Sequence, residues 1–126
     1  MDKDPGPVAE FSAKGNAMAY DEGLAEIMRT DLEGLGRIEE KRMFGGLCFM
    51  LDGHMACGVH KGGAMFRVGK ERHATALAID GASEMAMTGR KMGGMVDVTD
   101  EAAADDTRRA QWMALSVENV RSLPPR

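Results

Sequence analysis

The sequence predicts an α+β fold with elements in the order helix, three antiparallel strands, helix, two strands, helix. Two observations support this order. Apolar residues recur at helical spacing near both ends of the 126-residue chain, and glycine pairs with one strong hairpin turn divide its middle. The hydrophobic fraction is 44% and the charged fraction 29%, as in ordinary globular domains. At this length we expect one domain with one core.

Residues 1–17 mix Pro, Gly, Asp, Lys and Ala without any period. This composition is typical of a disordered arm or of a remnant of expression, so the ordered domain is expected to span residues 18–126. No apolar stretch approaches the ~18–20 residues that a membrane span needs. With two cysteines and no recognisable export signal, we expect a cytoplasmic protein with reduced thiols and no membrane association.

The first helix is predicted over residues 21–35. Its apolar residues fall on one helix face, which we expect to be buried: Leu24, Ile27, Met28, Leu32 and Leu35. Asp21 and Glu22 suit the positive N-terminal end of such a helix. Gly34 and Gly36 are expected to end it.

The rest of the chain is predicted from turns and periodicity. A strand-rich stretch covers residues 37–69, in which Asp52-Gly53 is the strongest turn signal. A second helix is predicted over residues 70–79, and two short strands within residues 84–98. A final helix is predicted over residues 105–123, where Pro-Pro ends it.

The Asp52-Gly53 turn also predicts the register of a hairpin. Counting outward from the turn gives four opposite pairs: Leu51 with His54, Met50 with Met55, Phe49 with Ala56, and Cys48 with Cys57. Alternation then places Cys48, Met50, Met55 and Cys57 on one side, and Leu47, Phe49, Leu51 and Ala56 on the other. Both sides are largely apolar, so helices or another subunit should cover both.

Four sulfur-containing side chains on one side of this hairpin have three interpretations. Directly opposite cysteines could form a strained, labile cross-strand disulfide. Two thiolates with Met50 and Met55 would make a soft site suited to Cu(I). Alternatively, small cysteines and pliable methionines line a core or a dimer face, which is the commoner use of such residues.

Other chemistry is not indicated. The net charge of −4 argues against direct nucleic-acid binding, which usually needs a basic surface. No Gly-x-Ser-x-Gly turn or Gly-Lys-Ser/Thr phosphate loop is present. His54 and His60 differ in strand parity from Cys57, so these three residues do not predict a zinc site. We therefore expect no enzymatic activity and no cofactor.

Several short motifs resemble the TfoX N-terminal domain family. They are Met18-Ala19-Tyr20-Asp21-Glu22, Arg42-Met43-Phe44-Gly45-Gly46, Phe49-Met50, Gly58-Val59-His60, Phe66-Arg67-Val68-Gly69, Thr88-Gly89-Arg90 and Arg121-Ser122-Leu123-Pro124-Pro125. The resemblance runs from residue 18 to the C-terminus. Its signature positions, and thus the candidate binding residues, are Met43, Phe44, Gly45, Gly46, Arg67, Gly89 and Arg90.

The resemblance implies a compact α+β fold similar to type III secretion chaperones, often dimeric. It also implies a role like that of competence regulators, which act on transcription through protein partners, and it brings no catalytic residues. The second, helical domain of those regulators is not found in this chain. We therefore expect a stand-alone regulatory module that binds a protein partner as a homodimer. The alternatives are a redox or Cu(I) sensor using Cys48 and Cys57, and a small-molecule pocket near Arg67 and Arg90.

Overall fold

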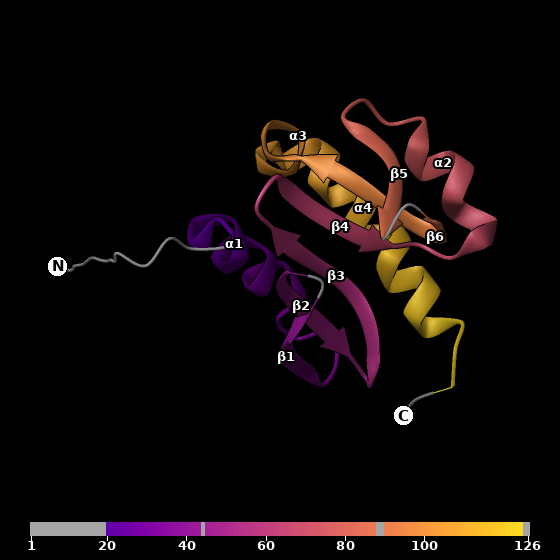
Figure 1. Cartoon of the computed structure of the whole chain (residues 1–126). Coiled ribbons are helices and arrows are strands. Elements are labelled where there is room, and N and C mark those ends of the chain that lie inside the picture. Colours follow the sequence, from indigo (N-terminus) through magenta and orange to yellow (C-terminus); the bar gives the residue numbers. More distant parts are fainter. Residues whose placement is uncertain (1–19, 44, 88–89, 125–126) are drawn as a thin grey trace, which may run out of the picture.

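The computed structural model describes residues 20–43, 45–87 and 90–124, without the side chains of residues 86–92, and confirms the α+β class (Figure 1). Six strands form one antiparallel sheet in the order β1-β2-β3-β4-β6-β5. The strands are β1 (Ile38–Met43), β2 (Gly46–Leu51), β3 (His54–His60), β4 (Gly63–Arg67), β5 (Ala82–Met87) and β6 (Arg90–Thr99). The helices are α1 (Glu22–Leu32), the 3-10 turn η1 (Lys70–Arg72), α2 (His73–Leu77), α3 (Asp100–Ala104) and α4 (Asp106–Arg121).

The helices pack on one face of the sheet, which we call the helix-covered face. Its core joins side chains from α1, α2, α3 and α4 to every second strand residue, among them Phe49, Val59 and Phe66. At its centre Trp112 of α4 stacks on Phe66 with ring centroids 5.9 Å apart, and its indole N–H donates to the Ala76 carbonyl at 3.1 Å. The opposite, helix-free face carries a separate buried cluster that includes no residue from the described helices.

Helix α1 begins where the sequence predicts. The Asp21 carboxylate accepts hydrogen bonds from the backbone N–H groups of Gly23 at 2.8 Å and Leu24 at 3.2 Å, which caps the helix. The helix ends at Leu32, three residues earlier than predicted, because the chain turns at Gly34, whose φ is +80°. Ile27, predicted to lie in the buried stripe, is instead 41% exposed.

Strand β1 was not predicted as a separate strand. Its central residues are all charged and exposed: Glu39, Glu40, Lys41 and Arg42. The segment therefore lacks the alternation of apolar and polar residues that predicts a strand. Charge of this kind is typical of an edge strand, where it discourages pairing with other chains. The Arg29 guanidinium of α1 donates two hydrogen bonds to the Glu40 carboxylate, one of them at 2.9 Å. This ion pair connects α1 to the edge strand β1.

The β2–β3 hairpin confirms half of the predicted register. Asp52 and Gly53 both have positive φ, at 52° and 87°, as a two-residue hairpin turn requires. Leu51 lies opposite His54 and Met50 opposite Met55, as predicted. Beyond that point the register shifts, because Ala56 is an extra residue in β3. Phe49 therefore lies opposite Cys57, and Cys48 opposite Gly58. The predicted pairs Phe49–Ala56 and Cys48–Cys57 are wrong.

The second half of the chain follows the predicted order with two changes. The helix predicted over residues 70–79 is split into η1 and α2, and a short helix, α3, precedes α4. Helix α4 matches the predicted final helix closely, with Asp105 as its N-cap. Beyond α4, the Pro124 carbonyl lies 2.5 Å from the His54 ring nitrogen Nε2, so the buried His54 fixes the end of the described chain to the hairpin turn.

Candidate functional site

The two glycines of the Met-Phe-Gly-Gly motif have different structural roles. Gly45 has φ of +73°, a conformation that residues with a side chain rarely adopt. Gly46 begins β2, and a Cβ atom there would lie 1.9 Å from the Val59 carbonyl oxygen. Together with Tyr20, Arg42 and Met43 they line an open hollow. Phe44 lies outside the described residues, and binding at this motif stays a prediction.

The other signature positions lie at the helix-free face and in the β5–β6 hairpin. Arg67 ends β4 on the helix-free face, opposite Met95 of β6. Its side chain is exposed and forms no ion pair or hydrogen bond with any residue that the structure describes. Gly89 and the side chain of Arg90 lie outside the described part of the chain. A small-molecule pocket between Arg67 and Arg90 therefore stays a prediction.

The structure divides the predicted set of sulfur residues between the two faces. Cys48, Met50 and Met55 lie on the helix-free face, as predicted. The extra residue in β3 reverses the parity beyond Met55, so Cys57 points into the helix-covered core. Both cysteines are free and buried. The prediction that Cys48 and Cys57 face each other on one side of the hairpin is therefore wrong.

Neither cysteine has the environment of a reactive thiolate. Burial raises the pKa of the Cys48 thiol to about 11. Burial raises the pKa of Cys57 even further, and the nearby Cys48 and Asp31 add to that increase. Thiols that remain protonated at neutral pH are poor nucleophiles.

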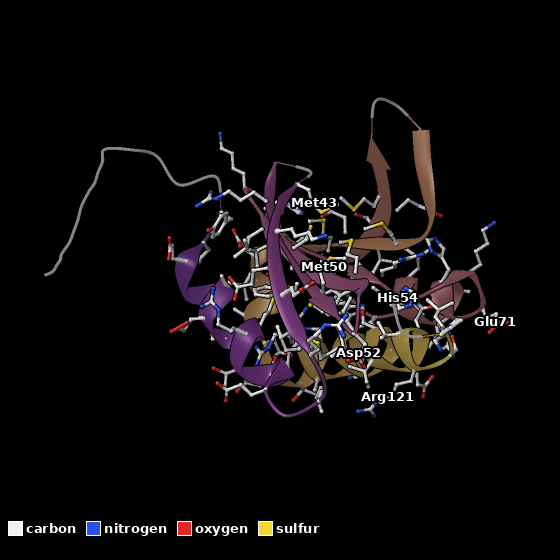
Figure 2. All side chains as sticks on the ribbon, turned by 90° about the horizontal axis from the view of Figure 1, so that it is seen from below. Met43, Met50, Asp52, His54, Glu71 and Arg121 are labelled. Atoms are coloured by element: carbon white, nitrogen blue, oxygen red, sulfur yellow. The ribbon has the colours of Figure 1, made fainter. Side chains whose placement is uncertain are left out.

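The sulfur cluster on the helix-free face is larger than the sequence suggested. It consists of Cys48, Met55, Met65, Met85 and Met95, with the half-buried Met43 and Met50 packed against them. Figure 2 shows sulfur atoms gathered between the β1–β2 and β5–β6 hairpins, with Met43 and Met50 on the β1–β2 side. The sequence could not join Met65, Met85 and Met95 to this set, because doing so requires the order of all six strands.

A groove of about 570 Å³ lies between α1 and α3. Its apolar part consists of Leu24, Ile27 and Ala104, and its polar part includes Asp100 and Glu101. Ile27 is the exposed large hydrophobic side chain among the described residues. Asp100 and Glu101 are exposed and form no ion pair with another described residue. The groove thus combines an apolar floor with an acidic rim.

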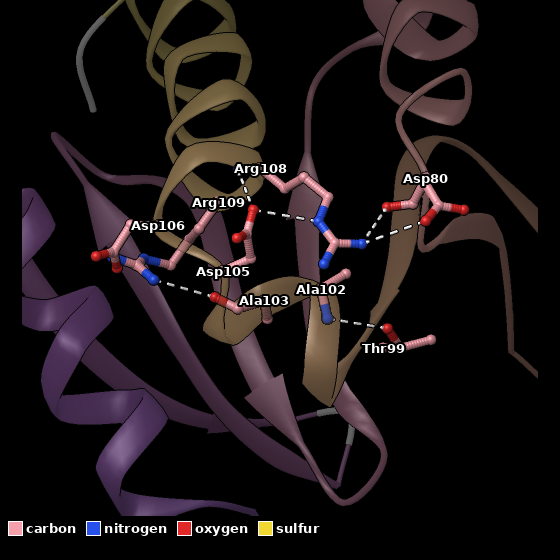
Figure 3. A network of polar contacts seen from close by, with 8 residues as sticks. All are labelled: Asp80, Thr99, Ala102, Ala103, Asp105, Asp106, Arg108 and Arg109. Carbon is pink, nitrogen blue, oxygen red and sulfur yellow. Dashed lines mark hydrogen bonds and ion pairs between the residues drawn. The ribbon is translucent and has the colours of Figure 1, made fainter.

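Polar contacts fix α3, and with it one wall of this groove (Figure 3). The Thr99 hydroxyl caps α3 by accepting from the Ala102 N–H at 3.1 Å. Buried Arg109 of α4 donates to the Ala103 carbonyl at 3.1 Å and to Asp31 of α1 at 2.7 Å. This guanidinium therefore holds α1, α3 and α4 in place relative to one another.

The described residues place no group of three or more His, Cys, Asp or Glu side chains where they could hold a metal ion. Methionine thioethers are a separate class of ligand. Within the same residues, no helix is both long and apolar enough to cross a membrane.

The fold and the groove define a small antiparallel α+β domain with helices on one face of its sheet. The family model of the TfoX N-terminal domain matches residues 30–120. The chain therefore belongs to the TfoX N-terminal domain family, which confirms the resemblance seen in its motifs. No match was found among curated proteins or among solved structures.

Proposed function

We propose that this domain is a non-enzymatic regulatory module that binds a partner protein in the groove between α1 and α3. The supporting observation is Ile27, a large aliphatic side chain left 41% exposed on a helix whose other apolar residues, such as Leu24 and Met28, are buried. Ile27 lies in a groove whose apolar part is bordered by Asp100 and Glu101, and an apolar surface rimmed by polar residues commonly marks an interaction site. The family membership supports a role related to that of the competence regulators.

The groove also indicates the chemistry of the partner. An aliphatic side chain placed against Ile27 and Leu24 would be removed from water, which contributes about 1.5–3 kcal/mol for a Leu-sized group. Asp100 and Glu101 would then favour Lys or Arg on the same segment. We therefore expect the partner segment to be apolar on one side and basic on the other, and its affinity to fall as the salt concentration rises.

Cross-linking would test this proposal. A photoreactive amino acid at position 27 should form adducts with a partner in a cell extract, whereas the same group at Glu71, an exposed residue of η1, should not. Substitution of Ile27 by Ser should abolish co-purification of that partner and change the free energy of unfolding by less than about 0.5 kcal/mol, because the side chain is on the surface. Equal cross-linking from both positions would contradict the proposal.

We further propose that the domain acts as a homodimer in the cytoplasm. Its family relationship supports a dimer, and the edge strand β5 lacks a partner strand on its outer side among the described residues. Light scattering coupled to size-exclusion chromatography should give twice the chain mass. A monomer at every concentration up to the millimolar range would refute the dimer but leave the groove proposal standing.

A further inference from the structure

The methionines of the sheet are distributed unevenly between its two faces. All described strand methionine side chains belong to the helix-free face: Met43, Met50, Met55, Met65, Met85 and Met95. The strand residues of the helix-covered core are aliphatic or aromatic, apart from Cys57. The methionines of the helix-covered core, Met28 and Met113, come from helices, so within the described strands methionine is confined to the helix-free face.

The strand register places thioether and thiol groups close together. Cys48 of β2 lies opposite Gly58 of β3, which lies opposite Met65 of β4. Gly58 has no side chain, and a Cβ atom there would be 2.7 Å from the terminal methyl group of Met65. The Met65 thioether therefore extends over Gly58, on the side of Cys48, and both residues are fully buried.

Burial limits what this cluster could bind. Cys48 and Met65 are inaccessible, and Met55, Met85 and Met95 are each at most 7% exposed. The cluster is therefore no docking surface for a protein segment. Met43 and Met50, which pack against the cluster, are half-buried (Figure 2). A ligand would have to be small and to prefer sulfur.

We propose that the helix-free face binds one soft monovalent metal ion, Cu(I) or Ag(I), through the Cys48 sulfur and neighbouring methionine thioethers. Soft cations of this kind select thiolate and thioether ligands over oxygen and nitrogen. On binding, a metal–sulfur bond forms at Cys48 and its thiol proton passes to solvent. The methionine sulfurs donate lone pairs, and nothing is oxidised or reduced. Cys57 takes no part, because it lies on the other face of the sheet.

Proton release makes the binding dependent on pH. Cys48 is fully buried, and the metal must displace its thiol proton in order to bind the sulfur. The apparent affinity should therefore increase as the pH rises, one proton being released for each ion bound. Binding by thioethers alone would show no such dependence.

The test uses the full chain and Cu(I) supplied anaerobically from its bicinchoninate complex. Native mass spectrometry should show one bound ion per chain, and the affinity from competition should rise with pH. Cys48→Ser should lose the ion, whereas Cys57→Ala should retain it, and circular dichroism establishes that each variant is folded. A wild-type chain that takes no Cu(I) from the competitor would overturn the proposal, as would loss of the ion in Cys57→Ala but not in Cys48→Ser.

Thioether participation has its own test, which also serves if Cys48→Ser does not fold. Met50→Leu and Met55→Leu keep the thiol and nearly the same side-chain volume. Each should weaken Cu(I) binding at least severalfold, while Met113→Leu, in α4 on the other side of the sheet, should not. Unchanged affinity in both cluster variants would overturn the proposed role of the thioethers. This inference does not depend on the α1–α3 groove, so either proposal can fail alone.

Discussion

The two faces of the sheet are formed by the same strands but have different side chains. On the helix-covered face, Phe49, Phe66 and Trp112 are rigid aromatic groups with defined packing partners. On the helix-free face, equally buried positions are occupied by methionines, whose flexible side chains specify no single arrangement. Burial alone therefore does not determine which side chains occupy a face. One face is suited to fixing the fold, and the other to accommodating change.

The two faces are also separated by one local feature. The extra residue Ala56 in β3 reverses the alternation, so Met55 and Cys57 point to opposite faces although they are two residues apart. Each face consequently has one buried cysteine. These two cysteines form a natural matched pair for experiments that compare the faces.

The largest expected difference involves two neighbouring residues of β4. Phe66→Ala should lower the free energy of unfolding by about 3–5 kcal/mol, because it leaves a cavity against Trp112. Met65→Leu, on the other face, should cost less than about 1.5 kcal/mol because the volume is nearly conserved. Urea denaturation monitored by circular dichroism would measure both. Similar losses would show that the helix-free face is packed as tightly as the helix-covered face.

A second test concerns the gap that Gly58 leaves in the sulfur cluster. Gly58→Ala should destabilise the fold by about 1–3 kcal/mol, because the added methyl group would meet the Met65 methyl at 2.7 Å and the Leu47 carbonyl at 2.8 Å. Gly62→Ala is the control, since there the nearest atom is 3.6 Å away. Thermal unfolding of both variants would reveal the difference. If Gly58→Ala left the unfolding temperature unchanged, the side chains of the cluster would be able to move aside at little cost in free energy.

A smaller effect is expected at the rim of the helix-free face, where His60 contacts Asp97 at 2.6 Å. The hydrogen bond to Asp97 raises the pKa of His60 in the folded protein above its usual value of 6.5, despite partial burial. Its contribution to stability is therefore complete below pH ~6.5 and is lost as the pH rises through the higher folded-state pKa. Asp97→Asn should remove this part of the pH dependence above pH ~6.5. If stability varied with pH in the same way in the variant and the wild type, the His60–Asp97 pair would not be the source of this pH dependence.

The smallest perturbation leaves the sequence unchanged and compares the two thiols. Both are buried with a raised pKa, so neither should react with iodoacetamide at pH 7.5 in the native protein. In mild denaturant Cys48 should react before Cys57, because no helix of the described chain covers its cluster and local opening suffices to expose it. Peptide mapping by mass spectrometry would give both rates. Simultaneous labelling would show that the faces open as one unit.

Local signals in the sequence predicted the helix-covered face well. Asp21 and Asp105 marked two helix starts, and the Asp52-Gly53 turn set the first two pairs of the hairpin. These features depend on residues close together in the chain. The bulge was missed because alternation counts residues as if none were extra, and nothing about Ala56 marks it as unpaired.

The candidate sites were less predictable for the same physical reason. Ile27 has the helical spacing of a buried residue, but it is 41% exposed, because tertiary packing and not spacing decides which part of the helix is covered. The sulfur cluster needs Met85 and Met95 beside Met65, and that neighbourhood follows from β6 lying between β4 and β5. A single sequence contains the residues of both sites but not the tertiary contacts that bring them together.

The position of Trp112 has a practical consequence for optical measurements. It is the only tryptophan in the chain, and it is fully buried between Phe66 and α2. Intrinsic fluorescence excited at the indole band will therefore follow the helix-covered core and will be nearly silent about the sulfur cluster. A single emission curve would make a chain with a loosened helix-free face look intact. A second reporter on that face would be needed to see it change.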